Sequence, residues 1–199
     1  MNIIFATANM GKLREAREIL GPGYEVCSSA DAGFLEDIEE TGATFRENSL
    51  IKARAVYEAT GRDCFADDSG LEVDALGGAP GIYSARYADG ESCSGGHDFD
   101  ANIAKLLREL SKCPGASRKA RFRCVVTLIL GGEPHFFDGT LEGSISLEPS
   151  GTEGFGYDPV FIPDAFPGRT MAELGEEVKN EISHRSQALH QMAEFLLHL

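Results

Sequence analysis

Residues Phe65–Ala88 read FADDSGLEVDALGGAPGIYSARYA, and the predicted fold is built outward from this stretch. The apolar residues Cys64–Ala66 predict a short strand that ends at two adjacent carboxylates, Asp67 and Asp68. Because neighbouring side chains on a strand point in opposite directions, only one aspartate is expected to face a site. A carboxylate at a strand end suits a hard cation with oxygen ligands. The same residues would serve equally in a plain aspartate turn with no chemical role.

Small residues and glycines follow the two aspartates. Ser69–Gly70 predicts a turn, and Leu71–Val73 predicts a second extended segment. Gly77–Gly81 is a backbone that must bend, and Ser84–Tyr87 brings an arginine directly after it. Such a concentration of glycine and proline next to charged residues is more typical of a functional loop than of a simple connector.

The composition limits the class of protein. The chain has 199 residues, enough for one large domain or two small lobes. Its net charge of −14 repels polyanions, so we expect neither a nucleic-acid polymer nor an anionic membrane as a partner. No leader sequence opens the chain and no apolar run is long enough to span a bilayer, which indicates a cytoplasmic protein. The five cysteines are odd in number and lack paired spacing, which argues against a disulfide framework and a zinc site.

The N-terminus has the pattern of a strand, a loop and a helix. Asn2–Ala6 predicts a buried strand, and apolar residues recur at helical spacing over Leu13–Leu20. The loop between them is Thr7-Ala8-Asn9-Met10-Gly11-Lys12. Backbone N–H groups at such a helix start can bind an anion, and Lys12 would add a positive charge, although the spacing is not that of a Walker loop. An ordinary turn with an asparagine cap and a solvated lysine fits the same residues.

A second helix is predicted from the capping-box pattern that begins at Thr44, and it should end at Gly61. Asn48 and Lys52 are four residues apart and would share one face of this helix. By default Lys52 would be an exposed helical lysine with no specific role. Glu40, just ahead of the helix, would by default be a solvated loop carboxylate.

The second half of the chain is predicted to supply mainly scaffold. Asp98–Leu110 has the pattern of an amphipathic helix, and Ala120–Leu130 with His135–Leu147 has that of a β-hairpin. The hairpin concentrates no candidates for chemistry and could serve as a dimer surface. A capping box at Thr170 predicts a short helix, and the last helix is expected to begin at Ser183.

Two features of this half suggest a ligand. Glycines flank Phe155 within Gly151–Pro159, which would leave the ring open for stacking on a base, although the ring could equally lie in the core. His184 and Arg185 fall in the first turn of the last helix, where cations oppose the helix dipole. That unfavourable placement suggests an anionic or carbonyl-bearing ligand.

Five motifs together resemble the inosine triphosphate pyrophosphatase family, and they occur in the family's order: Thr7–Lys12, Asp67–Leu71, Pro80–Tyr87, Phe155–Pro159 and Ser183–Arg185. The resemblance implies a mixed α/β fold over residues 1–199 as a single domain. A long central sheet with flanking helices would form two lobes that enclose a nucleotide-binding cleft. It further implies a homodimer that uses Mg²⁺ to convert non-standard purine nucleoside triphosphates to monophosphates and pyrophosphate.

The resemblance also implies roles for individual residues. Glu40 and Asp68 would hold Mg²⁺, Asp68 would accept a proton from the attacking water, and Lys52 would act beside it. Thr7 to Lys12 would bind phosphates, and donors near His184 and Arg185 would select a 6-oxo purine over adenine. The expected substrate-binding residues are Thr7, Ala8, Asn9, Met10, Gly11, Lys12, Ser69, Arg86, Phe155, Gly156, Tyr157, Asp158, Lys179, His184 and Arg185.

Two other functions stay open at this stage. A related enzyme acting on pyrimidine nucleotides would need a different base pocket. A nucleotide sensor would bind without turnover, but pure binding does not require a pair of metal carboxylates.

Overall fold

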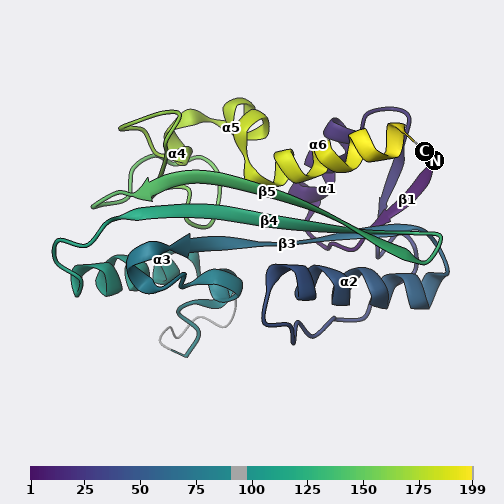
Figure 1. The fold of residues 1–199 in the computed structure, drawn as a ribbon, viewed down its shortest axis with the longest axis horizontal. Helices are drawn as coiled ribbons and strands as arrows, with labels where there is room; N and C mark the ends of the chain where they lie inside the picture. Colours follow the sequence, from purple (N-terminus) through teal and green to yellow (C-terminus); the bar gives the residue numbers. More distant parts are fainter. Residues whose placement is uncertain (91–97, 199) are drawn as a thin grey trace. The chain divides into compact units, whose positions relative to one another are not determined.

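The fold was obtained as a computed structural model, which describes residues 1–90 and 98–198. It is a mixed α/β fold in which six strands form one sheet in the order β2-β1-β3-β4-β5-β6, with helices flanking the sheet (Figure 1). β1 (Asn2–Phe5) pairs in parallel with both β2 (Glu25–Ser28) and β3 (Cys64–Val73). The predicted mixed α/β architecture is therefore confirmed.

The other three strands include the predicted hairpin. β4 (Lys119–Leu130) and β5 (Glu133–Ile145) are neighbours in the sheet and are joined by Gly131–Gly132, both with positive φ. So short a connection requires antiparallel strands. β6 (Phe161–Pro163) is antiparallel to β5.

The chain divides into two compact units. Three strands, β3, β4 and β5, each run from one unit into the other. Unit 1 consists of Met1–Asp68, Cys124–Gly139 and His184–Leu199, and unit 2 consists of Ser69–Arg123 and Thr140–Ser183.

Unit 1 has helices on both faces of its part of the sheet. α1 (Met10–Leu20) and α6 (His184–Leu197) cover one face, and α2 (Phe45–Thr60) covers the other (Figure 1). Side chains of β1 alternate between these layers: Ile3 belongs to the apolar cluster with α1 and α6, whereas Ile4 belongs to the cluster with α2. Each face of a unit 1 strand therefore meets a different set of helices.

Unit 2 has its own apolar cluster, to which Leu106 and Phe161 contribute fully buried side chains. Its predicted amphipathic helix is confirmed, and the capping box at Thr170 is present. The helical elements of this unit are η1 (Asp74–Leu76), η2 (Gly81–Arg86), α3 (Phe99–Ser111), α4 (Met171–Leu174) and α5 (Glu176–Ile182).

The cap predicted for α2 is confirmed with one change. Thr44 Oγ1 accepts a hydrogen bond from Glu47 N (3.1 Å), and Gly61 ends the helix in the left-handed conformation. The Glu47 carboxylate, however, accepts from Ala43 N (2.6 Å), one residue earlier than in a standard capping box. The first turn of α2 thus also holds the loop that precedes it.

The predicted turn at Ser69–Gly70 is wrong. β3 runs without a break from Cys64 to Val73, and Gly70 is buried within it. Turn residues express only a local preference, and the membership of β3 in a sheet with strands that are remote in sequence outweighs it. Asp67 and Asp68 consequently lie in the middle of a long strand and not at a strand end.

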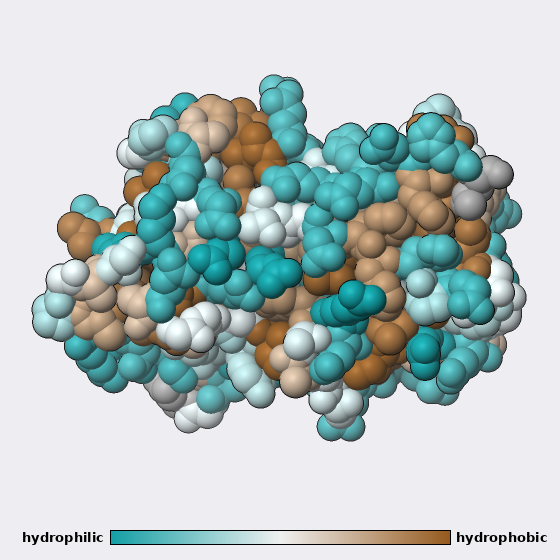
Figure 2. All heavy atoms as spheres, viewed as in Figure 1, coloured by the Kyte–Doolittle hydropathy of each residue, from teal (hydrophilic) through white to brown (hydrophobic). Residues whose placement is uncertain are grey.

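The hydropathy of the visible surface is consistent with a chain in which 25% of the residues are charged. Hydrophilic residues cover much of the face seen in Figure 2, with smaller hydrophobic areas between them. Among residues 1–90 and 98–198, no helix combines the length and hydrophobicity that a membrane crossing needs. Four cysteines in this part of the chain are free thiols, and Cys93 lies outside it.

Candidate active site

Asp67 and Asp68 are consecutive on β3, and they contact helices on opposite faces of the sheet. Asp67 is bonded to side chains of α1 and α6, and Asp68 to side chains of α2. The two side chains therefore point to opposite sides of the strand, as strand geometry predicts. Both carboxylates are buried and bonded to charged partners, and neither lies in a turn.

The Asp67 side chain is the centre of a buried charge cluster. Lys12 Nζ donates to both of its oxygens (3.0 and 2.9 Å), and Arg185 Nε donates to Oδ2 (3.0 Å). Arg185 Nη1 also donates to Glu15 Oε2 (3.1 Å). Two carboxylates therefore meet two cations, and the side chains of Asp67 and Arg185 are only 2% and 4% exposed. The carboxylates of Asp67 and Glu15 stabilise the positive charge of Arg185 in the first turn of α6. The unfavourable position of this arginine, which in the sequence alone suggested a ligand, is thus explained by contacts within the protein.

Electrostatics explain how this cluster stays ionised. Burial alone would raise the pKa of Asp67, but Lys12 and Arg185 outweigh it and hold that pKa well below its usual range. Burial likewise acts to lower the pKa of Arg185, and Asp67 and Glu15 raise it on balance. Glu15 was missed from the sequence, although its place three residues after Lys12 on α1 puts both on one helical face.

The loop before α1 is held by its own side chains. Asn9 Oδ1 accepts from Gly11 N (2.9 Å) and Lys12 N (3.1 Å), and Asn9 N donates to Thr7 Oγ1 (3.1 Å). The asparagine cap is therefore present, but the lysine beside it is not solvated as the alternative required. The Lys12 side chain remains 21% exposed while its ammonium is bonded to Asp67. Ala8 and Met10 lie exposed in the same segment.

On the other face, Asp68 and Glu40 share one cation. Lys52 Nζ lies 2.7 Å from Glu40 Oε1 and 3.2 Å from Asp68 Oδ1. Asn48 Nδ2 donates to Asp68 Oδ2 (3.2 Å). Burial raises the pKa of Asp68, and Lys52 offsets this only in part. The pKa of Lys52 is also raised, because its carboxylate neighbours outweigh its burial. Neither Glu40 nor Lys52 is thus the solvated side chain of the default interpretation.

The carboxylate pair fits a divalent cation. In the described part of the chain, no three His, Cys, Asp or Glu side chains gather to hold a metal. Mg²⁺, however, commonly takes one or two protein carboxylates and keeps several waters. Glu40 and Asp68 already hold a positive charge between them, that of Lys52. Glu40 and Asp68 are therefore the residues that could hold Mg²⁺ here.

A second group of predicted site residues lies in unit 2, around Phe155. Its ring is 47% exposed, which excludes the interpretation that places it in the core. Lys179 Nζ lies 4.1 Å from the ring centroid and donates to Asp158 Oδ2 (2.6 Å), which also accepts from Phe155 N (2.9 Å). A Cβ at Gly154 would collide with the Asp158 carboxylate, so the glycine permits this close loop. Phe99, which no local signal indicated, lies 6.4 Å from Phe155 between ring centroids.

Other predicted residues have different surroundings. Tyr157 is buried and donates to Ser84 O (2.9 Å), which ties the loop of Gly156 to η2. Arg86 lies over the Tyr83 ring, 5.4 Å from its centroid. Ser69 is half-buried on β3, where unit 2 begins. His184, in contrast, is buried at the start of α6 in unit 1.

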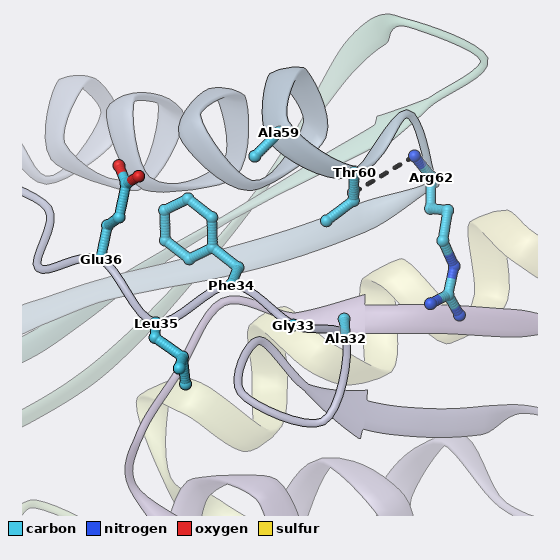
Figure 3. A pocket seen from close by; sticks show the side chains of 8 residues that line it. All are labelled: Ala32, Gly33, Phe34, Leu35, Glu36, Ala59, Thr60 and Arg62. Carbon is cyan, nitrogen blue, oxygen red and sulfur yellow. Dashed lines mark hydrogen bonds between the residues drawn. The ribbon is translucent and has the colours of Figure 1, made fainter.

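A pocket of about 500 Å³ lies elsewhere in unit 1. In Figure 3 the Phe34 ring lies beneath α2, with Glu36 and Arg62 at opposite ends of the view. None of the predicted site residues lines it; the lining residues are Ala32, Gly33, Phe34, Leu35, Glu36, Ala59, Thr60 and Arg62.

Comparison with known proteins places the chain. The sequence profile of the Ham1 family matches residues 3–195. The chain belongs to the Ham1 family. The resemblance inferred from the five motifs is thereby confirmed.

Individual members of the Ham1 family match the chain over nearly its whole length. It is 51% identical to the dITP/XTP pyrophosphatase of Porphyromonas gingivalis, over 98% of this chain and 97% of the relative. It is 50% identical to the dITP/XTP pyrophosphatase of Bacillus subtilis, over 97% and 96% of the two chains. The solved structure of a HAM1 protein from Coxiella burnetii matches with a TM-score of 0.90 and 40% identity, and each chain is fully covered.

Proposed function

We propose that this Ham1-family chain is a nucleoside triphosphate pyrophosphatase that hydrolyses non-standard purine nucleotides such as dITP, ITP and XTP. The products would be the nucleoside monophosphate and pyrophosphate, with Mg²⁺ as cofactor. One observation carries the proposal. On one face of β3 the Asp67 carboxylate binds Lys12, and on the other face Lys52 bridges the carboxylates of Asp68 and Glu40. Its substrate class is supported by relatives of about half identity that are dITP/XTP pyrophosphatases.

Asp68 is suited to accept the proton of the attacking water. Burial raises its pKa toward the range in which a general base is effective, while Lys52 favours the ionised form that can take a proton. Lys52 and Lys12 would supply positive charge to the phosphates and to the pyrophosphate leaving group, where negative charge develops. Glu40 and Asp68 would hold Mg²⁺, which when bound supplies further neutralisation of phosphate charge.

The base is assigned to the group around Phe155. An exposed ring can stack on any base, and stacking of this kind contributes about 1–3 kcal/mol. Asp158 and Lys179 add an acceptor and a donor beside that ring. The roles of His184 and Arg185 in reading the 6-oxo group stay predictions, and Arg185 already uses Nε and Nη1 for Asp67 and Glu15.

The experiment that tests the activity is an assay of pyrophosphate release from dITP, XTP, GTP, ATP and dUTP, each with Mg²⁺ and with EDTA. We expect release from dITP and XTP with Mg²⁺ only. Preferential turnover of dUTP would support the pyrimidine enzyme instead, and nucleotide binding without release would support the sensor.

The same proposal includes a homodimer, as the resemblance implies, and the cytoplasmic location expected from the sequence pattern. Light scattering coupled to gel filtration would measure the mass of the assembly against the 21.4 kDa of one chain. A mass of one chain at assay concentration would remove the dimer from the proposal.

A further inference from the structure

Asn48 links Asp68 to the loop that carries Glu40. Its side chain is fully buried on α2, and its Nδ2 donates to Asp68 Oδ2 (3.2 Å). At the other end of the amide, Oδ1 accepts from Gly42 N (2.8 Å), two residues after Glu40. The amide orientation follows from its neighbours, because the reversed amide would set its oxygen against a carboxylate and its NH₂ against an N–H donor.

Gly42 makes this link possible by its lack of a side chain. A Cβ at Gly42 would lie 2.6 Å from Asn48 Oδ1 and 2.9 Å from Asn48 N. It would also lie 2.6 Å from Glu47 Cβ, and the Glu47 carboxylate holds the next residue, Ala43, at its backbone N–H. The loop is therefore seated directly on the first turns of α2, and a side chain at this position would lift it away.

We propose that Asn48 is a positioning residue of the reaction, which sets the Glu40 and Asp68 carboxylates at a fixed separation through Gly42. The inference rests on the proposed function, since it assigns a role to the support of the same carboxylates. The side-chain hydrogen bonds of Asn48 go to Asp68 and to the Glu40 loop, so it would act through these two carboxylates.

The chemistry of an amide suits this role. Lys52, one turn further along α2, also bridges the two carboxylates. It does so with its positive charge, so another cation that binds between the carboxylates would have to displace the Lys52 ammonium. Asn48 is neutral and bonds to the second oxygen of Asp68, so it does not compete for that place. Asn48 can therefore keep Asp68 and the Glu40 loop at the same separation whether Lys52 or another cation lies between the two carboxylates. Partners of metal-binding carboxylates typically change metal affinity or activity by about 10- to 100-fold when they are removed.

The test uses two variants that break the link at different ends and one matched control. Asn48→Leu keeps the approximate volume but removes donor and acceptor, and Gly42→Ala displaces the loop without changing Asn48 or Asp68. The control is Ser49→Ala, which removes an equally buried polar group of α2, the Ser49 hydroxyl hydrogen-bonded to Thr127 (2.6 Å). It lowers stability by a similar mechanism but touches neither carboxylate.

Three measurements are made on each full-length variant: steady-state kinetics with dITP, which give kcat and KM; the Kd of inosine α,β-imidotriphosphate in EDTA; and the binding of Mn²⁺ alone by electron paramagnetic resonance. We expect Asn48→Leu and Gly42→Ala to lower kcat and Mn²⁺ affinity by about 10- to 100-fold, while the Kd in EDTA stays at the wild-type value. Ser49→Ala should match the wild type in all three.

Values of kcat and Mn²⁺ affinity in both link variants equal to those of Ser49→Ala would overturn the proposal. If Asn48→Leu does not fold, Gly42→Ala decides alone. If the wild type releases no pyrophosphate, the proposed function fails, and the Mn²⁺ titrations then decide the positioning role separately: weaker binding in the link variants supports it and equal binding rejects it.

Discussion

Asp67→Asn should destabilise the protein far more than an equivalent change in an exposed ion pair. Lys12 and Asp67 are 2.9 Å apart, and Lys119 and Asp164 in unit 2 are 2.8 Å apart. The two pairs differ in burial: Asp67 is 2% exposed, whereas Lys119 and Asp164 are 53% and 50% exposed. Comparison of Asp67→Asn with Asp164→Asn therefore contrasts the loss of a buried charge that binds two cations with the loss of an exposed charge that binds Lys119.

The expected magnitude follows from what each substitution leaves behind. Asp67 accepts three hydrogen bonds from cations, and its replacement would remove a carboxylate charge from the buried Arg185. Removing one member of a buried charge cluster costs about 3–5 kcal/mol, whereas an exposed pair contributes at most about 1 kcal/mol. For a chain of this size, a loss of about 3–5 kcal/mol in the free energy of unfolding corresponds to a fall in Tm of roughly 6–20 °C.

The assay is urea denaturation followed by far-UV circular dichroism, because the chain contains no tryptophan. Its pH dependence provides a second check. The pKa of Asp67 is lowered in the folded state, so its contribution is present above the unfolded pKa of about 3.9 and is lost as the pH falls below it. The difference between wild type and Asp67→Asn should therefore be full at neutral pH and shrink in acid. Equal costs for Asp67→Asn and Asp164→Asn, or a difference that does not change with pH, would refute this reasoning.

Four further predictions concern catalysis and substrate choice. Asp68→Asn should lower kcat by orders of magnitude while nucleotide binding persists, since it removes a proton acceptor and a ligand charge together; a near-normal kcat would shift both roles elsewhere. Lys12→Ala should lower kcat/KM for all triphosphates alike, and a changed base preference would contradict a phosphate-binding role. Phe155→Ala should weaken the binding of every substrate by about 1–3 kcal/mol, which is measured as a fall in kcat/KM for ITP, GTP and ATP alike. Arg185→Ala should reduce the preference for ITP over ATP, and an unchanged ratio would assign the 6-position to another group.

Local features of the fold could be predicted from the sequence because the interactions that create them are local. The cap at Thr44, the end of α2 at Gly61 and the capping box at Thr170 each depend on residues within a few positions. The supposed turn at Ser69–Gly70 shows the limit of such reasoning. Its residues have a turn preference, but they lie within β3, whose sheet neighbours are remote in sequence, and the sheet overrides that preference.

The candidate site could be predicted as a set of residues but not as a set of contacts. Motif order identified Lys12, Asp68 and Arg185, yet Arg185 lies 118 residues from its partner Asp67, and no spacing rule covers that interval. The interpretation of Phe155 as core or exposed was undecided for the same reason, because burial depends on the packing of the whole unit. Asn48 was noted only for sharing a helical face with Lys52.

The consecutive placement of the two aspartates constrains the length of β3. Because the side-chain period of a strand is two, inserting or deleting one residue between Phe65 and Leu71 would turn every following side chain to the opposite face. An insertion ahead of Asp67 would bring Asp67 to the position of Asp68 and leave Lys12 and Arg185 without a carboxylate, whereas a deletion there would bring Asp68 to the position of Asp67 and leave Lys52 and Asn48 without one. A change of length ahead of the aspartates would therefore remove a carboxylate from one of the two clusters, so gaps among related sequences should fall in the loops outside this segment.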